Sequence, residues 1–159
     1  MKRLAVILIL LMLPGLAAPG LASAEEMLTV KSAATVKDTL DRLELAAKAN
    51  GFSIVARVDH AANAERVGLP LRPTALLVFG KAQGGTPVIQ CDQRIGLELP
   101  LRAVAWQDAD GQVWLGMADP AVLKARYGLS AACDAPLAAM QGAVRGLLDQ
   151  ATRPQLDNR

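Results

Sequence analysis

Residues 101–117 read LRAVAWQDADGQVWLGM, and this stretch predicts a β-hairpin. Its outer segments, 101–107 and 112–117, read as two strands, and the turn between them ends at Gly111, a residue suited to the left-handed position of a short hairpin loop. With a three-residue loop, Trp106 lies opposite Trp114, and an aromatic pair of this kind stabilises adjacent strands. The hairpin therefore indicates a sheet that is antiparallel at least here.

Three further strand patterns precede the hairpin. Residues 28–32 alternate with period two, and residues 52–60 do the same as far as His60. Residues 74–79 form an unbroken apolar run, which is typical of an interior strand covered on both faces. The sequence thus supplies enough strands for one sheet.

Helical patterns are interleaved with these strands. The most regular runs from a capping residue, Thr35, to Asn50, after which Gly51 can adopt the left-handed conformation that ends helices. Between the strands we expect a connection with room for one helical turn at 61–68 and a loop at 80–85. We expect a short helix that Thr86 caps, with Pro87 in its first position. Two further helices are expected, one from Asp119-Pro120 to Gly128 and a last one at 135–151. The pattern predicts an α+β fold, a two-layer sandwich with helices on one face of a largely antiparallel sheet.

The N-terminus has the features of a secretory signal peptide. Lys2 and Arg3 precede the apolar run 4–13, and Ala22-Ser23-Ala24 offers the small residues that signal peptidase requires. A permanent membrane helix is the alternative, but prolines and glycines interrupt the second half of the segment. We therefore expect a signal peptide at 1–24, a single domain at 25–151 and a disordered tail at 152–159, in a periplasmic or secreted bacterial protein that meets the membrane only before cleavage.

Charge excludes one class of partner. Cleavage after Ala24 would remove two of the 17 basic residues and leave them equal in number to the 15 acidic ones. Nucleic-acid binding depends largely on basic side chains that neutralise phosphates, so a neutral domain is not expected to bind nucleic acid.

The two cysteines admit two interpretations. In an oxidising compartment, Cys91 and Cys133 are candidates for a disulfide. Two separate buried thiols are the alternative.

Several motifs together resemble a bacterial family, the domain of unknown function 302. They are RVDHAA at 57–62, RPTALLVFG at 72–80 followed by Gly85-Thr86-Pro87, and a third set spread over 99–120. The resemblance covers about residues 28–148 and implies a small α+β sandwich that tends to form homodimers, with no established activity. The chain departs from the family pattern at Met117-Ala118 and at Tyr127.

Few residues could carry chemistry. His60, the sole histidine, could act as acid, base or ligand beside Asp59, or only bond the following turn. Arg72, within a family-like motif, and Asp119 are further candidates for ligand binding. A Cu or Zn site could use His60 with Cys91, with Cys133 as a helper, although no CxxC or HxxxH spacing supports it.

The expected function is therefore binding. No GxSxG motif and no phosphate-binding GK[ST] motif occurs in the sequence. We expect an exported, non-catalytic domain that binds a small ligand or a protein partner, needs no cofactor and forms a homodimer. Two alternatives stay open at this point: a thiol or metal protein centred on Cys91, and an enzyme that uses His60 as base.

Overall fold

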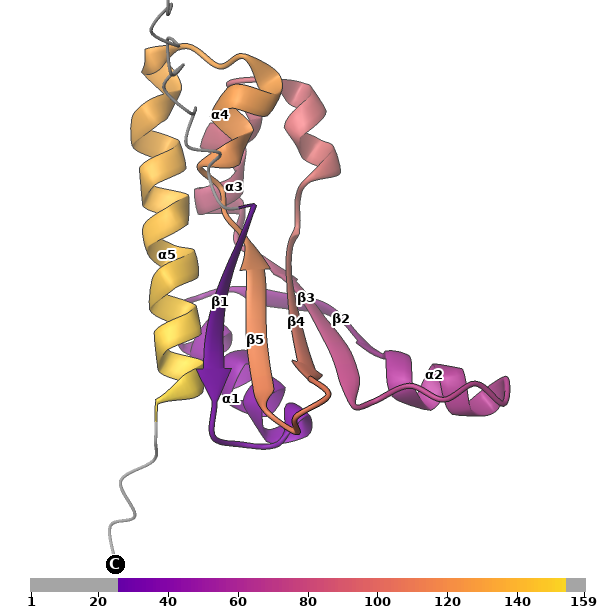
Figure 1. Ribbon diagram of the computed structural model, residues 1–159. Helices are drawn as coiled ribbons and strands as arrows, with labels where there is room; N and C mark the ends of the chain where they lie inside the picture. The colour runs from indigo at the N-terminus through magenta and orange to yellow at the C-terminus, as the bar shows by residue number, and fades with distance from the viewer. Residues whose placement is uncertain (1–25, 154–159) are drawn as a thin grey trace, which may run out of the picture.

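The chain folds into a twisted sheet with helices packed across one face, as Figure 1 shows for the computed structural model, which describes residues 26–153. The five strands are antiparallel and lie in the order β1-β5-β4-β3-β2. The elements are β1 Met27–Ser32, α1 Val36–Ala49, β2 Ser53–Asp59, α2 His60–Arg66, β3 Thr74–Gly80, α3 Ala82–Ile89, the 3-10 helix η1 Gln93–Leu97, β4 Leu101–Gln107, β5 Val113–Ala118, α4 Val122–Tyr127, η2 Ala131–Cys133 and α5 Asp134–Thr152. The predicted α+β sandwich is confirmed; the expected signal peptide and residues 154–159 of the expected tail lie outside the described residues.

The hairpin between β4 and β5 forms as predicted. Trp106 is the register partner of Trp114, and their rings stack with centroids 6.4 Å apart. Gly111 has a φ of 83°, the left-handed region that glycine enters without strain. The carboxylate of Asp108 accepts a hydrogen bond from Trp114 Nε1 at 2.7 Å, so one turn residue also fixes the indole ring.

The core lies between the sheet and the two long helices. Leu40 and Leu43 of α1 and Val144 and Leu147 of α5 are buried against the strands. As expected, the side chain of Thr35 caps α1 by accepting a bond from the Asp38 N–H at 3.1 Å. The spacing of apolar residues on both helices thus places one face of each on the sheet.

The prediction for β3 was wrong in one respect. Along this strand buried residues alternate with half-buried ones, so Ala75, Leu77 and Phe79 face the core while Leu76 and Val78 point to the other side. The reason is that the long helices cover only one face of the sheet (Figure 1). An unbroken apolar run does not by itself establish that both faces are covered.

Two helix boundaries also differ from prediction. α3 begins at Ala82, within the expected loop, and Pro87 lies inside the helix instead of in first position. Val88 is completely buried, and this packing outweighs the weak helix preferences of Gly84 and Gly85. α2 is a seven-residue helix that begins at His60, longer than one turn, whereas His60 had been expected to end the strand.

The two ends of the sheet differ. α3, η1 and α4 gather at the end where β3 and β5 finish, whereas α2 follows β2 at the opposite end and projects away from the sheet (Figure 1). None of the helices in residues 26–153 is long and apolar enough to span a membrane.

Candidate functional site

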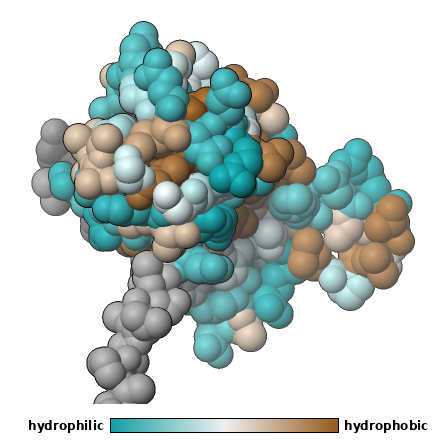
Figure 2. All heavy atoms as spheres, turned by 90° about the horizontal axis from the view of Figure 1, so that it is seen from above, coloured by the Kyte–Doolittle hydropathy of each residue, from teal (hydrophilic) through white to brown (hydrophobic). Residues whose placement is uncertain are grey.

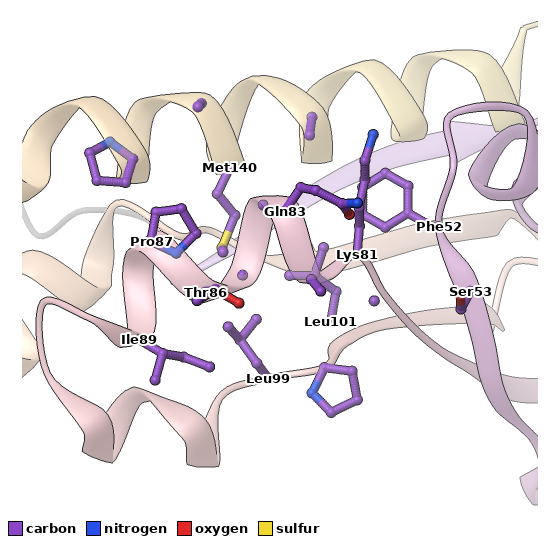
Figure 3. A pocket seen from close by; sticks show the side chains of 18 of the residues that line it. Phe52, Ser53, Lys81, Gln83, Thr86, Pro87, Ile89, Leu99, Leu101 and Met140 are labelled. Atoms are coloured by element: carbon purple, nitrogen blue, oxygen red, sulfur yellow. The ribbon is translucent and has the colours of Figure 1, made fainter.

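A cavity of about 770 Å³ lies at the end of the sheet that carries α3. Four parts of the chain enclose it: the start of β2, α3, the segment before β4 and one face of α5 (Figure 3). Its volume falls within the range of about 300–1,000 Å³ that is usual for small-molecule sites. The lining residues are Asn50, Phe52, Ser53, Val55, Gly80 to Pro87, Ile89, Leu99 to Leu101, Pro136, Ala139, Met140 and Ala143.

The walls of the cavity are mostly apolar. Phe52 forms part of one wall and packs edge-on against the buried Phe79, with ring centroids 5.6 Å apart. Leu99 enters from the segment before β4, Leu101 from the first position of β4, and Met140 from α5 (Figure 3). A ligand could therefore bury apolar surface here on walls that the core already holds in place.

Lys81 is the one charged residue in this lining. Its ammonium group donates a hydrogen bond to the carbonyl oxygen of Asn50 at 3.0 Å and lies 5.9 Å from the ring centroid of Phe52. No carboxylate of residues 26–153 forms an ion pair with it. The ammonium group has three donors, so it can bond an anionic group without giving up its contact with the backbone.

The remaining polar groups of the lining are uncharged. Ser53 and Thr86 offer hydroxyl groups, and Gln83 offers an amide. Among the lining residues there is no histidine, cysteine or carboxylate, the groups that most often act as nucleophile, acid or base. What this lining offers is apolar contact, hydrogen bonding and one positive charge.

Cys91 and Cys133 are joined by a disulfide next to this cavity. Cys91 follows α3, and Cys133 immediately precedes α5, so the bond connects two walls of the cavity. The structure therefore agrees with the disulfide interpretation of these cysteines and not with two separate buried thiols. In this form Cys91 has no thiolate with which to bind a metal.

The shared metal site expected for His60 and Cys91 does not form, which corrects that hypothesis. His60 begins α2, whereas Cys91 follows α3, and β3 runs from one of these ends of the sheet to the other. Seven residues of strand extend roughly 20 Å, far beyond the two bond lengths of about 2 Å that a common metal allows. Among residues 26–153 no three His, Cys, Asp or Glu side chains cluster as metal ligands would.

The other two candidates lie apart from the cavity as well. Arg72 lines a smaller hollow of about 430 Å³ beside Trp106, and its Nε donates to the carbonyl of Gln107 at 3.1 Å. Asp119 is buried and accepts hydrogen bonds from Gln141 Nε2 at 2.8 and 3.0 Å. His60, Arg72 and Asp119 are thus not brought together, and none of them lines the main cavity.

The carboxyl groups with a lowered pKa lie outside the cavity. The hydroxyl of Tyr127, followed by the guanidinium of Arg126, lowers the pKa of Glu98. The indole N–H of Trp114 is the main cause that lowers the pKa of Asp108. These shifts belong to hydrogen-bonded pairs that fix loops, and they give the cavity neither an acid nor a base.

Sequence reasoning missed the cavity because its lining is chemically plain. The one usable signal was the small residues Ala82, Gly84 and Gly85, since small side chains leave space beside a helix, but glycines in this segment predict a loop. The apolar residues that face the cavity cannot be distinguished in sequence from residues of the core.

Comparison with known proteins identifies relatives. Residues 28–147 match the family model described as Domain of unknown function DUF302. A solved structure, described as an uncharacterized conserved protein DUF302 from Bacillus stearothermophilus, has the same fold with a TM-score of 0.73 and 24% sequence identity, over 82% of this chain and 100% of that one.

Curated relatives are longer than the matching region. The protein named Fluoride-specific ion channel FluC 1 of Brucella suis is 44% identical over 114 residues, which cover 72% of this chain and 45% of that protein. The protein of the same name in Brucella abortus matches at the same identity over 42% of its length. The chain thus spans less than half the length of these relatives. Because the family model covers most of it, the chain belongs to the DUF302 family, the domain of unknown function 302.

Proposed function

We propose that this protein is a non-catalytic binding domain whose cavity holds a small, largely apolar molecule with one anionic end. The observation that carries the proposal is the lining: apolar walls and Lys81 as the one charged residue. A buried ligand gains affinity from the apolar surface that it removes from water, and its charged end gains specificity from a matching group.

The arrangement of the walls supports binding in preference to catalysis. Met140 is nearly buried, and Phe52 packs on Phe79 of the core, so the apolar surface is preformed. The hydroxyls of Ser53 and Thr86 have no histidine or carboxylate in the lining to activate them. The runner-up, a metal or free-thiol function, would need Cys91 reduced and a second ligand within reach, and the geometry provides neither.

Dodecanoate is the probe that tests the proposal. It should raise the melting temperature of the protein, because a ligand that binds only the folded state stabilises it by mass action. Lys81→Met should reduce the affinity for dodecanoate by about tenfold and leave the affinity for dodecanol within about twofold, since only the former presents a charge to the ammonium group.

A pair of variants on α5 provides the matched control. Ala139→Trp should block binding because Ala139 lines the cavity, whereas Ala138→Trp, at the exposed neighbouring position, should leave it unchanged. Dodecanoate binding that is unaffected by Ala139→Trp would contradict the proposal, and so would the failure of both probes to bind.

We further propose that the domain works outside the cytoplasm. The residues that support this are Lys2, Arg3, the apolar run 4–13 and the small residues up to Ala24, together with a disulfide, which oxidising compartments favour. Export should leave a protein in the periplasmic fraction whose mass corresponds to a chain that starts at Glu25. Recovery of the protein only from the cytoplasmic fraction would contradict this proposal.

A second candidate function comes from the curated relatives. Proteins named as fluoride channels contain a segment 44% identical to this chain, and none of the helices in residues 26–153 could span a membrane. The matching segment covers 45% of the Brucella suis protein, so more than half of that protein lies outside it. We propose from this likeness that the present chain acts beside a fluoride channel.

Deletion of the gene tests this second candidate. Loss of the protein should lower the fluoride concentration that stops growth and leave tolerance of chloride unchanged. Complementation with the Lys81→Met variant then asks whether the cavity takes part. Unchanged fluoride tolerance in the deletion strain would remove the channel proposal and leave the ligand proposal standing.

A further inference from the structure

A projecting arm, residues 60–73, extends from the end of the sheet opposite the cavity. It consists of α2 and the segment that leads to β3, and Figure 1 shows it reaching away from the rest of the molecule. No residue of α2 is buried. The arm is therefore held by its two connections to β2 and β3 and presents most of its surface outward.

The return segment of the arm, residues 66–72 and called the tip below, runs from the end of α2 back to the edge of the sheet, where Leu71 and Arg72 lie beside Trp106. Its large exposed side chains are mostly apolar. Val67, Leu69 and Leu71 have exposed fractions of 69%, 63% and 50%, and they are three of the seven large apolar side chains that are exposed in residues 26–153. Figure 2 shows apolar surface gathered at the end of the arm. Such clustering at a projection marks an interaction site, because single exposed apolar residues are ordinarily scattered.

Two arginines flank these apolar residues. Within the described part of the chain, Arg66 bonds only inside α2, to the carbonyl of Ala62 and the side chain of Asn63. Arg72 uses its Nε to bond the carbonyl of Gln107. Neither arginine forms an ion pair with a described carboxylate. The arm contains one acidic residue, the exposed Glu65, so the two arginines leave it with one net positive charge. Both guanidinium groups keep donors that match phosphate oxygens.

The size of the tip suits a membrane better than a protein partner. Three aliphatic side chains can bury only about 200–350 Å² of apolar surface, whereas a stable protein interface buries about 800 Å² on each side. A few apolar side chains with basic neighbours are enough for a surface that is itself large and negatively charged.

We propose that the tip docks on an anionic phospholipid bilayer. Val67, Leu69 and Leu71 enter the interfacial region, and Arg66 and Arg72 bind lipid phosphates. This inference does not depend on the proposed ligand. It leaves the cavity accessible, because the cavity lies at the other end of the sheet.

Vesicle binding tests the proposal. The protein is recovered from the periplasmic fraction and mixed with phosphatidylcholine vesicles, with or without phosphatidylglycerol. The wild type should sediment with the anionic vesicles, less so as salt rises, and bind the neutral vesicles at least about tenfold more weakly. Absence of binding to the anionic vesicles, or equal binding to both kinds, would overturn the proposal.

Two leucine pairs give a matched comparison. Leu69→Ser with Leu71→Ser should weaken binding by about tenfold or more, whereas Leu45→Ser with Leu97→Ser, at exposed positions off the arm, should change it less than about twofold. Arg66→Gln, a single change within α2, should weaken vesicle binding about threefold to tenfold. This variant tests the proposal if the protein with the two serine substitutions misfolds. Tip variants that bind as the wild type does overturn the proposal. The proposal is also overturned if the wild type binds no vesicles and is a dimer, and if the tip variant is a monomer. In that case the tip contacts a second copy of the chain.

Discussion

The sulfur atoms of Cys91 and Cys133 are bonded to each other across 42 positions of sequence, and this bond ties the end of the α3 region to the start of α5. Residues from both sides of the bond line the cavity, Ile89 from α3 and Pro136 from α5. The disulfide therefore acts on the separation of the cavity walls as well as on the entropy of the unfolded chain.

Replacement of both cysteines by serine should lower the free energy of unfolding by about 2–4 kcal/mol, because a loop of this length is no longer closed in the unfolded chain. For a domain of this size the melting temperature should fall on the order of 10 °C. Scanning calorimetry of the oxidised wild type, the reduced wild type and the double variant measures the effect. The reduced wild type and the double variant should have similar melting temperatures. A double variant as stable as the oxidised wild type would contradict the prediction.

Glu98 should make stability depend on pH. Its pKa lies below the ordinary value of 4.5, mainly because the Tyr127 hydroxyl donates to it at 2.9 Å, and also because of Arg126. A lowered pKa means that the carboxylate stabilises the fold above about pH 4.5 and that this contribution disappears as the pH falls through the folded-state pKa. Glu98→Gln should therefore cost about 1 kcal/mol at pH 7, and this cost should shrink as the pH falls through the folded-state pKa of Glu98.

Chemical denaturation at several pH values measures this difference. Glu65→Gln is the control, because Glu65 is exposed and forms no ion pair among the described residues. Its difference from the wild type should stay small across the range. A cost for Glu98→Gln that does not shrink as the pH is lowered would show that the charge is not its source.

Two glycines should respond in opposite directions to alanine. A Cβ at Gly116 would come within 3.1 Å of Trp106 Cζ3 and 3.0 Å of Met27 Sδ, and the indole ring cannot move aside because it is stacked on Trp114. Gly116→Ala should destabilise the protein by about 1–3 kcal/mol. Gly142→Ala in α5, where a Cβ meets nothing within 4 Å, should stabilise it by about 0.5–1 kcal/mol. Thermal unfolding of both variants checks the sign, and a shift in the same direction for both would refute the argument.

Asp119→Ala should affect stability and leave the ligand affinity unchanged. The buried carboxylate accepts hydrogen bonds from the side chain of Gln141 and from the Ala121 N–H, and its loss should cost about 1–3 kcal/mol. Asp110→Ala, in the exposed hairpin turn, should cost much less. Urea denaturation and dodecanoate titration together test this, and a loss of affinity with intact stability would return Asp119 to the candidate binding residues.

Local patterns in the sequence were enough to predict much of the fold. The tryptophan pair and Gly111 define the hairpin, and Thr35 and Gly51 bracket α1, because turn chemistry and helix capping involve residues close together in the chain. The start of α3 could not be predicted in this way. Its first four residues are Ala-Gln-Gly-Gly, and only the burial of Val88 explains why they are helical.

The candidate site was predicted least well. The residues singled out for their chemistry, His60, Arg72 and Asp119, lie apart, since reactivity is a property of a side chain whereas a site requires convergence. Nothing in the sequence distinguishes Lys81 from the other basic residues, 17 in all, and only the structure places it in an apolar wall.

The sequence by itself determined the α+β class, the antiparallel hairpin and the longest helices, because periodicity and capping act over a few residues. Only the tertiary structure decided where the cavity lies and which charge it contains, since Phe52, Lys81, Leu101 and Met140 are brought together by packing between segments that are distant in the chain. Apolar residues that line a cavity and apolar residues that fill a core obey the same hydrophobic preference, and what distinguishes them is whether a neighbouring element occupies the space beside them.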